Sequence, residues 1–155
     1  MEQIQFVYET FIRTTPEKLW AAITKPEFTR QYWGGGENVS EWKKGSKWQH
    51  VDPEENGEVC VTGEVVESVP PKRLVLTWAD PADPADGSQV SFEIEPLGDI
   101  VRLKILHGGF KPGSALPPRI SWGWPRVLSS LKSFLETGNA LKFGPGSPCD
   151  SVKHS

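Results

Sequence analysis

The sequence has little cysteine, no excess of basic residues and no long apolar run. Its two cysteines, Cys60 and Cys149, are too few for a disulfide framework or a thiolate metal site, and we expect no disulfide. Lys and Arg total 17 against 20 Asp and Glu, so a net charge of −3 provides no basic surface for nucleic acid or an anionic membrane. No apolar run approaches the roughly 20 residues that span a bilayer, and the N-terminus lacks the features of a secretory signal. We therefore expect a cytoplasmic protein with neither a nucleic-acid nor a membrane partner.

Histidine is also scarce, which bears on metal and catalytic chemistry. The three histidines, His50, His107 and His154, form no pair at the spacing of metal ligands, so we expect no metal site and no cofactor. The run Gly34–Gly36 follows an expected helix and lacks the Lys-Ser/Thr of a phosphate loop, so it is interpreted as a helix stop. No Ser-His-Asp or paired-carboxylate site follows from spacing. The sequence favours a protein that is not an enzyme and leaves catalysis open.

With 155 residues, the chain has a natural size for one domain with one core. We expect this domain to span residues 1–140. Residues 141–155 are expected to form a disordered tail, because the segment from Gly144 to Ser155 has too little apolar content to pack. The apolar faces of all expected elements must therefore meet in one core.

The first part of the chain predicts one strand and two short helices. Residues 4–13 are rich in β-branched and aromatic residues and predict a strand. Thr15–Glu17 combines an N-cap residue, a first-turn proline and a first-turn carboxylate, which predicts a helix to about Thr24. Lys25–Glu27 begins a second short helix at a new angle, and Gly34–Gly36 ends it.

From Asn38 onward the apolar pattern has a period of two, which predicts consecutive strands. Short turns separate these strands, so neighbours are expected to pair antiparallel. Asp80–Gly87 is predicted to be a polar loop stiffened by prolines. The expected strands cover residues 39–42, 48–51, 58–69, 74–78, 90–95 and 101–107.

The C-terminal part predicts one long helix between Gly123 and Gly138. Apolar residues at 124, 127, 128, 131, 134 and 135 form a single helical stripe. Pro125 is expected in the first turn, Gly138 just past the end, and Gly108–Pro118 in a loop before the helix. The element order predicts an α+β fold in which an antiparallel sheet of about seven strands curls around this helix. A single helix that covers a sheet almost alone can leave a cavity.

Three motifs resemble the SRPBCC superfamily, whose START-like or Bet v-like fold is called a helix grip. They are Thr15–Glu27, Gly63–Trp78 and Gly123–Gly138. Within the superfamily, the sequence is similar to homologues of the activator of the ninety-kilodalton heat-shock protein ATPase over about residues 4 to 138. The resemblance implies a hydrophobic cavity whose mouth lies near the early helices and the hairpin loops. The superfamily includes lipid and hormone carriers, polyketide aromatases and cyclases, while the eukaryotic activator stimulates a chaperone.

Seven tryptophans are many for this length, and each brings a large apolar surface with one N–H donor. Trp20 lies among core residues at helical spacing and is interpreted as core. For the others on strands, beside the glycine run or on the long helix, core packing and cavity lining both stay open. The expected ligand-binding residues are Trp33, Trp48, Trp78, Phe92, His107, Phe110, Trp124 and Leu128.

Two histidines are candidates for proton transfer or for orienting a ligand. His107 is in phase with Leu103 and Ile105, so it is expected to point to the covered face of the sheet. His50 alternates with Trp48 and can face inward as well. A hydrogen-bonded histidine without a catalytic role remains the alternative for both, since no second acid or nucleophile accompanies them.

Three functional hypotheses follow. The leading one is non-enzymatic binding of a small hydrophobic or aromatic molecule between sheet and helix, in a pocket of about 300 Å³ or more. The second is a co-chaperone-like protein that acts on a chaperone through its surface, where Lys43 and Lys44 form a cationic turn. The third is a cyclase or hydrolase with His107 or His50 as general acid/base. Nothing in the sequence indicates an oligomeric state.

Overall fold

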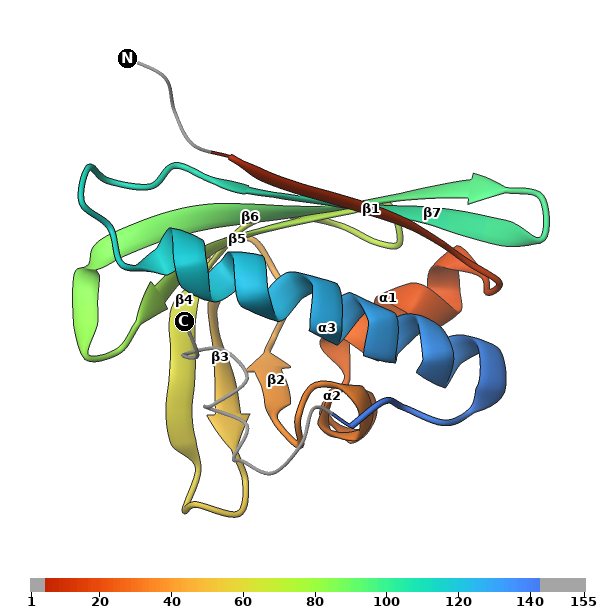
Figure 1. Cartoon of the computed structure of the whole chain (residues 1–155), viewed down its shortest axis with the longest axis horizontal. Coiled ribbons are helices and arrows are strands. Elements are labelled where there is room, and N and C mark those ends of the chain that lie inside the picture. Colours follow the sequence, from red (N-terminus) through yellow and green to blue (C-terminus); the bar gives the residue numbers. More distant parts are fainter. Residues whose placement is uncertain (1–4, 143–155) are drawn as a thin grey trace.

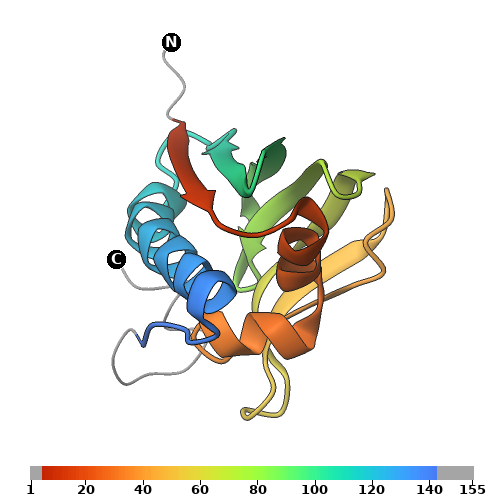
Figure 2. The ribbon, with the colours of Figure 1, turned by 90° about the vertical axis from the view of Figure 1, so that its right-hand side faces the viewer.

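The computed structural model describes residues 5–142, and Cys149 and His154 lie outside them. One antiparallel sheet has the strand order β1-β7-β6-β5-β4-β3-β2, so β1 and β2 are its edges. The sheet curls around the long helix α3, while α1 and α2 lie between the two edge strands (Figures 1 and 2). The strands are β1 (Phe6–Ile12), β2 (Glu37–Ser40), β3 (Lys47–Asp52), β4 (Glu58–Val69), β5 (Arg73–Asp80), β6 (Asp83–Leu97) and β7 (Ile100–Gly108), and the helices are α1 (Pro16–Thr24), α2 (Pro26–Tyr32) and α3 (Leu116–Thr137). The predicted α+β helix-grip architecture is confirmed.

The two short helices begin where the sequence predicts. The hydroxyl of Thr15 accepts a hydrogen bond from the backbone N–H of Lys18 at 3.2 Å and caps α1. Pro16 and Pro26 stand in the first turns of α1 and α2, where a missing N–H needs no partner. Local signals alone therefore place both helices.

Helix α3 begins earlier than the sequence predicts. It has 22 residues and starts at Leu116, so the predicted loop to Pro118 ends before Leu116. Pro117 lies in the first turn, whereas Pro125 lies inside the helix, so the prediction of Pro125 in the first turn is wrong. The reason is that α3 contains three prolines, and the upstream pair, Pro117 and Pro118, marks its start. Gly138 ends the helix with a φ of 84° and donates to the carbonyl of Phe134 at 2.8 Å, as predicted.

The predicted loop over Asp80–Gly87 is wrong for most of its length. Strand β5 continues to Asp80 and β6 begins at Asp83, so only a two-residue turn separates them. Residues 84–87 have no Cα partner on β5 or β7 in the described pairings. Proline is tolerated in such an extended segment because no ladder hydrogen bond is lost there.

A close approach between β3 and β5 requires glycine in β4. The indole N–H of Trp48 donates to the carbonyl oxygen of Thr77 at 2.7 Å. A Cβ at Gly63 would lie 2.0 Å from that oxygen and 2.5 Å from Trp48 Nε1. The β4–β5 pairing also shifts its register between Val65 and Glu67, close to this contact. Gly63 therefore allows a buried tryptophan to hydrogen-bond across the bent sheet.

Cys60 corrects the expectation of no disulfide. It is buried in β4 and disulfide-bonded. The expectation rested on cysteine count and redox compartment, and neither of these measures distance in a fold. Among residues 5–142, no helix is both long and apolar enough to span a membrane.

Candidate functional site

The concave face of the sheet and α3 enclose four buried tryptophans, which we call the tryptophan cluster: Trp33, Trp48, Trp78 and Trp124. Trp78 lies at the centre, with its ring centroid 5.5 Å from Trp48, 5.4 Å from Trp124 and 6.5 Å from Trp33. The rings come from the end of α2, from β3 and β5 and from the middle of α3. The fold thus brings together four of the predicted site residues from distant parts of the chain.

A small void lies beside the cluster, under α3. Its volume is about 10 Å³, which is about the space of one water molecule. Ligand pockets usually measure about 300 Å³ or more, so this void is far smaller than the pocket of that size predicted between sheet and helix. The void is lined by Trp33, Trp78, Arg119, Ile120, Gly123, Trp124 and Val127.

A larger hollow lies on the surface, between β1 and the C-terminal half of α3. Its volume is about 340 Å³, and its lining is mostly hydroxyl-bearing. Its two charged residues, Lys132 and Glu136, pair with each other at 3.0 Å. Glu136 also accepts from the backbone N–H of Arg13, and Lys132 donates to the carbonyl of Phe11. None of the predicted site residues lines this hollow, so we place the candidate site at the tryptophan cluster.

His107 is buried beside the cluster and uses both ring nitrogens. Trp124 Nε1 donates to His107 Nδ1 at 3.0 Å, and His107 Nε2 lies 2.8 Å from the hydroxyl oxygen of Ser88. That hydroxyl donates to the carbonyl of Trp78 at 3.0 Å, so its oxygen accepts from His107 Nε2–H. Burial lowers the pKa of His107 to about 3, and the ring is neutral. His107 therefore links α3 to β6 and β5 and has no nitrogen free for proton transfer.

His50 is buried as well, but it uses only one ring nitrogen. Its Nδ1 lies 2.7 Å from Asn38 Oδ1. The Asn38 amide nitrogen donates to the carbonyl of Ile23 at 3.0 Å, which orients the amide so that its oxygen faces His50. Nδ1 therefore carries the proton, and Nε2 is an acceptor. Burial lowers the pKa of His50 to about 3, so the ring is neutral.

The acceptor on His50 and a donor on Trp33 are both unpaired. Neither His50 Nε2 nor Trp33 Nε1 has a hydrogen-bond partner among the described residues, although both side chains are at most 2% exposed. The two ring centroids are 4.8 Å apart, and Trp33 lines the void. A buried polar atom without a partner costs about 1–3 kcal/mol. The site therefore presents one donor and one acceptor on adjacent rings in apolar surroundings.

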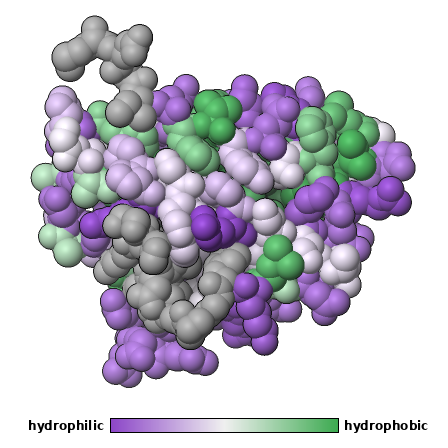
Figure 3. Space-filling view, viewed as in Figure 1, coloured by the Kyte–Doolittle hydropathy of each residue, from purple (hydrophilic) through white to green (hydrophobic). Residues whose placement is uncertain are grey.

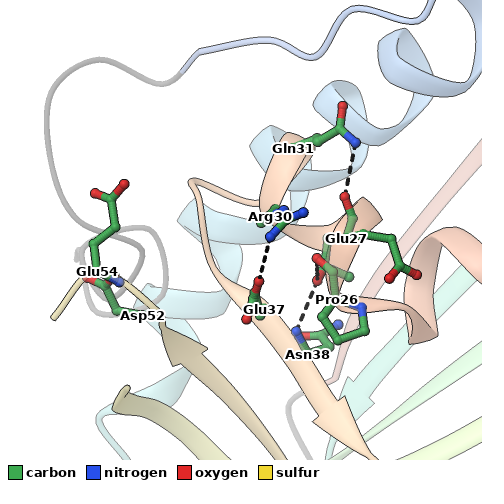
Figure 4. Close-up of polar contacts among 9 residues, drawn as sticks. Pro26, Glu27, Arg30, Gln31, Glu37, Asn38, Asp52 and Glu54 are labelled. Atoms are coloured by element: carbon green, nitrogen blue, oxygen red, sulfur yellow. Dashed lines mark hydrogen bonds and ion pairs between the residues drawn. The ribbon is translucent and has the colours of Figure 1, made fainter. Parts of the chain in front are cut away.

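Helix α2 and strand β2 hold Trp33 in place. Trp33 follows α2 directly and donates its backbone N–H to the carbonyl of Thr29 at 2.8 Å. The Thr29 hydroxyl accepts from the backbone N–H of Asn38 at 3.0 Å, so α2 is joined to β2. Arg30 and Glu37 add an ion pair at 3.4 Å between the same elements (Figure 4). The same asparagine that orients His50 therefore also helps to fix the end of α2.

Three other predicted site residues lie around the cluster without lining the void. Phe92 packs edge-on against Trp124 at 5.7 Å, and Phe110 stacks on His107 at 5.3 Å. Leu128 is buried in the core. The contacts of Trp48 are those with Trp78 and Thr77 described above. These positions are compatible with packing, and a ligand-binding role for them stays a prediction.

Several residues of the site were not identified from the sequence. Arg119 and Ile120 line the void from the part of α3 that the prediction assigns to no helix, and Gly123 lines it from the start of the predicted helix. The three-to-four residue spacing that links Ile120 with Trp124 and Val127 was the available signal, and the proline positions obscured it. Asn38 and Ser88 were missed because a hydrogen-bond partner is a property of the fold and carries no pattern of its own.

The start of α3 covers the void and is fastened to the β5–β6 hairpin. Arg119 pairs with Asp80 at 3.0 Å, and the backbone N–H of Ala115 donates to Asp86 at 3.0 Å. On the face that carries α3, the described surface is mostly hydrophilic or intermediate, and its hydrophobic patches are small and separate (Figure 3). The apolar side chains of the cluster are buried, and residues of α3 line one side of the void.

Comparisons with known proteins cover most of the chain. Residues 13–136 match the family model of activator of Hsp90 ATPase homolog 1-like proteins. A search of curated proteins finds no match. Among solved structures, protein MLL2253 from Mesorhizobium loti is 29% identical, with a TM-score of 0.72 over 85% of this chain and 96% of that chain.

Two further solved structures share the fold at lower identity. The Aha1 dimer from Colwellia psychrerythraea is 20% identical, with a TM-score of 0.72 over 87% of this chain and 98% of that chain. An Hsp90 activator from Plasmodium falciparum is 21% identical, with a TM-score of 0.71 over 84% of this chain and 95% of that chain. At these identities the likeness shows a common fold alone.

Proposed function

Because the chain belongs to the family of activator of Hsp90 ATPase homolog 1-like proteins and its own fold buries the tryptophan cluster, we propose that it binds a small hydrophobic or aromatic molecule at that cluster. The observation that supports this most is the unpaired donor of Trp33, which lines the void, beside the unpaired acceptor of His50, whose ring centroid lies 4.8 Å from that of Trp33. An apolar core gains nothing from two such atoms. A ligand polar group that pairs with them recovers this cost, and the surrounding rings supply apolar contact.

Binding without catalysis fits the two histidines better than an enzymatic role. A general base works best with a pKa near the operating pH, whereas burial lowers the pKa of both His50 and His107 to about 3. His107 is also fully engaged by Trp124 and Ser88. His50 retains a free acceptor, which suits it to orient a ligand.

A ligand larger than water enters only when the cover moves. The void is lined on one side by the N-terminal half of α3, which is fastened through Arg119 to Asp80. Pro125 removes one backbone hydrogen bond inside α3 and gives the helix a natural point at which to bend. In our proposal the segment before Pro125 swings outward, and the segment after it stays packed.

Native mass spectrometry of the protein purified from its own host tests this proposal. We expect a retained small molecule whose mass disappears under denaturing conditions. The variant Trp33→Phe should retain less of it, while Trp20→Phe, which changes a tryptophan outside the cluster, should retain the wild-type amount. A wild-type protein that carries no molecule and shows no thermal stabilisation with any aromatic compound would contradict the proposal.

A second candidate is a co-chaperone-like role through the outer surface, which the family membership and two relatives described as Aha1 and as an Hsp90 activator favour. The turn between β2 and β3 exposes Lys43 and Lys44, which are suited to an acidic partner. Stimulation of Hsp90 ATPase activity, lost in Lys43→Glu/Lys44→Glu and kept in Trp33→Phe, would support this role over binding in the core.

A further inference from the structure

We infer that the polar group accepted at the tryptophan cluster is a neutral hydroxyl. This inference rests on the proposed function and specifies its ligand. A hydroxyl is a group whose single oxygen both accepts and donates a hydrogen bond. It can accept from Trp33 Nε1–H and donate to His50 Nε2, which are two of the four buried side-chain polar atoms without a partner among the described residues.

The acceptor character of His50 Nε2 follows from a chain of fixed partners. The carbonyl of Ile23 can only accept, so the Asn38 amide must present its nitrogen there and its oxygen to His50. That oxygen can only accept, so the proton of the neutral ring is on Nδ1. The opposite tautomer would place two acceptors 2.7 Å apart. A ligand must therefore bring a donor to Nε2.

The indole of Trp33 sets the second requirement, because Nε1–H can only donate. A ketone or an ether would satisfy Trp33 and leave His50 unpaired. An ammonium would satisfy His50 and leave Trp33 unpaired. A purely apolar molecule would leave both unpaired. Each unmet hydrogen bond is expected to weaken binding by about tenfold or more.

The charge around the void favours a neutral ligand. Among the described residues that line it, Arg119 is the one charged side chain, and Asp80 already pairs with it at 3.0 Å. A carboxylate would also present no donor to His50 and would lose its hydration among indole rings. The faces of Trp78 and Trp124 can hold an aromatic or aliphatic body next to the hydroxyl.

Phenol, anisole and toluene form a matched set for the test. They carry, on the same ring, a donor and acceptor, an acceptor alone, and neither. Titration of the ¹⁵N-labelled protein, followed by the tryptophan indole signals, gives the dissociation constant for each. We expect phenol to bind at least about tenfold more tightly than anisole, although anisole is the more hydrophobic molecule. The Trp33 indole proton should move downfield with phenol, as a new hydrogen bond requires.

Two variants separate the site from a general effect on stability. Trp33→Phe removes the donor and keeps an aromatic ring, so phenol affinity should fall about tenfold. Trp20→Phe is the control and should bind phenol as the wild type does. Circular dichroism confirms that both variants fold.

The outcomes separate the inference from the proposal on which it rests. Equal affinities for phenol, anisole and toluene at Trp33 would overturn hydroxyl recognition and leave small-molecule binding intact. Phenol binding that leaves Trp33 unperturbed would overturn the assigned site. No binding of any of the three at millimolar concentration would overturn the proposed function for simple aromatic molecules.

Discussion

The buried histidines predict a loss of stability in mild acid. His50 and His107 are 0% exposed, and burial lowers the pKa of each from 6.5 to about 3. Below pH 6.5 these two histidines become protonated in the unfolded chain but stay neutral in the folded protein. The contribution of each neutral histidine is therefore complete above pH 6.5 and is lost as the pH falls toward 3.

The size of this effect follows from the pKa difference. One pKa unit corresponds to about 1.4 kcal/mol. At pH 5 each histidine therefore lowers the free energy of unfolding by about 2 kcal/mol, and the two together lower it by about 4 kcal/mol. A domain of ordinary stability has a free energy of unfolding of about 5–15 kcal/mol, so this loss is a large part of the total.

Urea unfolding at pH 7 and pH 5, followed by tryptophan fluorescence and circular dichroism, measures the effect. Most carboxylates titrate below this window, and the pKa of Glu136 is lowered further by its bonds to the Arg13 N–H and to Lys132. The double variant His50→Gln/His107→Gln has no buried imidazole, so its stability should be nearly equal at the two pH values. A wild-type difference below about 0.5 kcal/mol, or an equal difference in the double variant, would refute the reasoning.

Two substitutions test the packing around the site. Gly63→Ala should lower the free energy of unfolding in urea by about 3 kcal/mol or more, because the new Cβ would lie 2.0 Å from the carbonyl oxygen of Thr77. Gly87→Ala is the control, because a Cβ there has open space around it. Equal losses of stability in the two variants would contradict the close approach at Gly63. Arg119→Ala should lower the free energy of unfolding by only about 0.2–1 kcal/mol. It should speed hydrogen exchange in the first turns of α3, because it releases that segment from Asp80. Unchanged exchange would show that the ion pair does not hold the start of α3 in place.

Elements with local signals were predictable from the sequence. Thr15 and Pro16 mark the start of α1, and Gly138 marks the end of α3, because caps depend on a few neighbouring residues. The start of α3 was not predictable, because Pro117 and Pro125 are both suited to a first turn and the stronger apolar pattern follows Pro125. The extension of β6 into Asp83 was also missed, since strand propensity argues against its prolines and acidic residues.

The apolar part of the site was more predictable than its polar part. Alternation and helical spacing indicate that Trp78 and Trp124 turn inward, and both line the void together with Trp33, which was singled out because it stands beside Gly34–Gly36. Both ring nitrogens of His107 are paired, whereas only Nδ1 of His50 is, and this difference depends on single hydrogen-bond partners. Asn38 lies opposite His50 in the β2–β3 pairing, but that register is a property of the fold and was not available from the sequence pattern. No sequence pattern indicates that His50 keeps a free nitrogen.

The central claim is that the unpaired atoms of Trp33 and His50 receive the polar group of a ligand inside the fold. A crystal structure of the protein soaked or grown with phenol tests it most directly. The account predicts the phenol oxygen within about 3 Å of both Trp33 Nε1 and His50 Nε2, with the first turns of α3 displaced outward. A structure with phenol bound only in the surface hollow between β1 and α3, and with the tryptophan cluster unchanged, would contradict it.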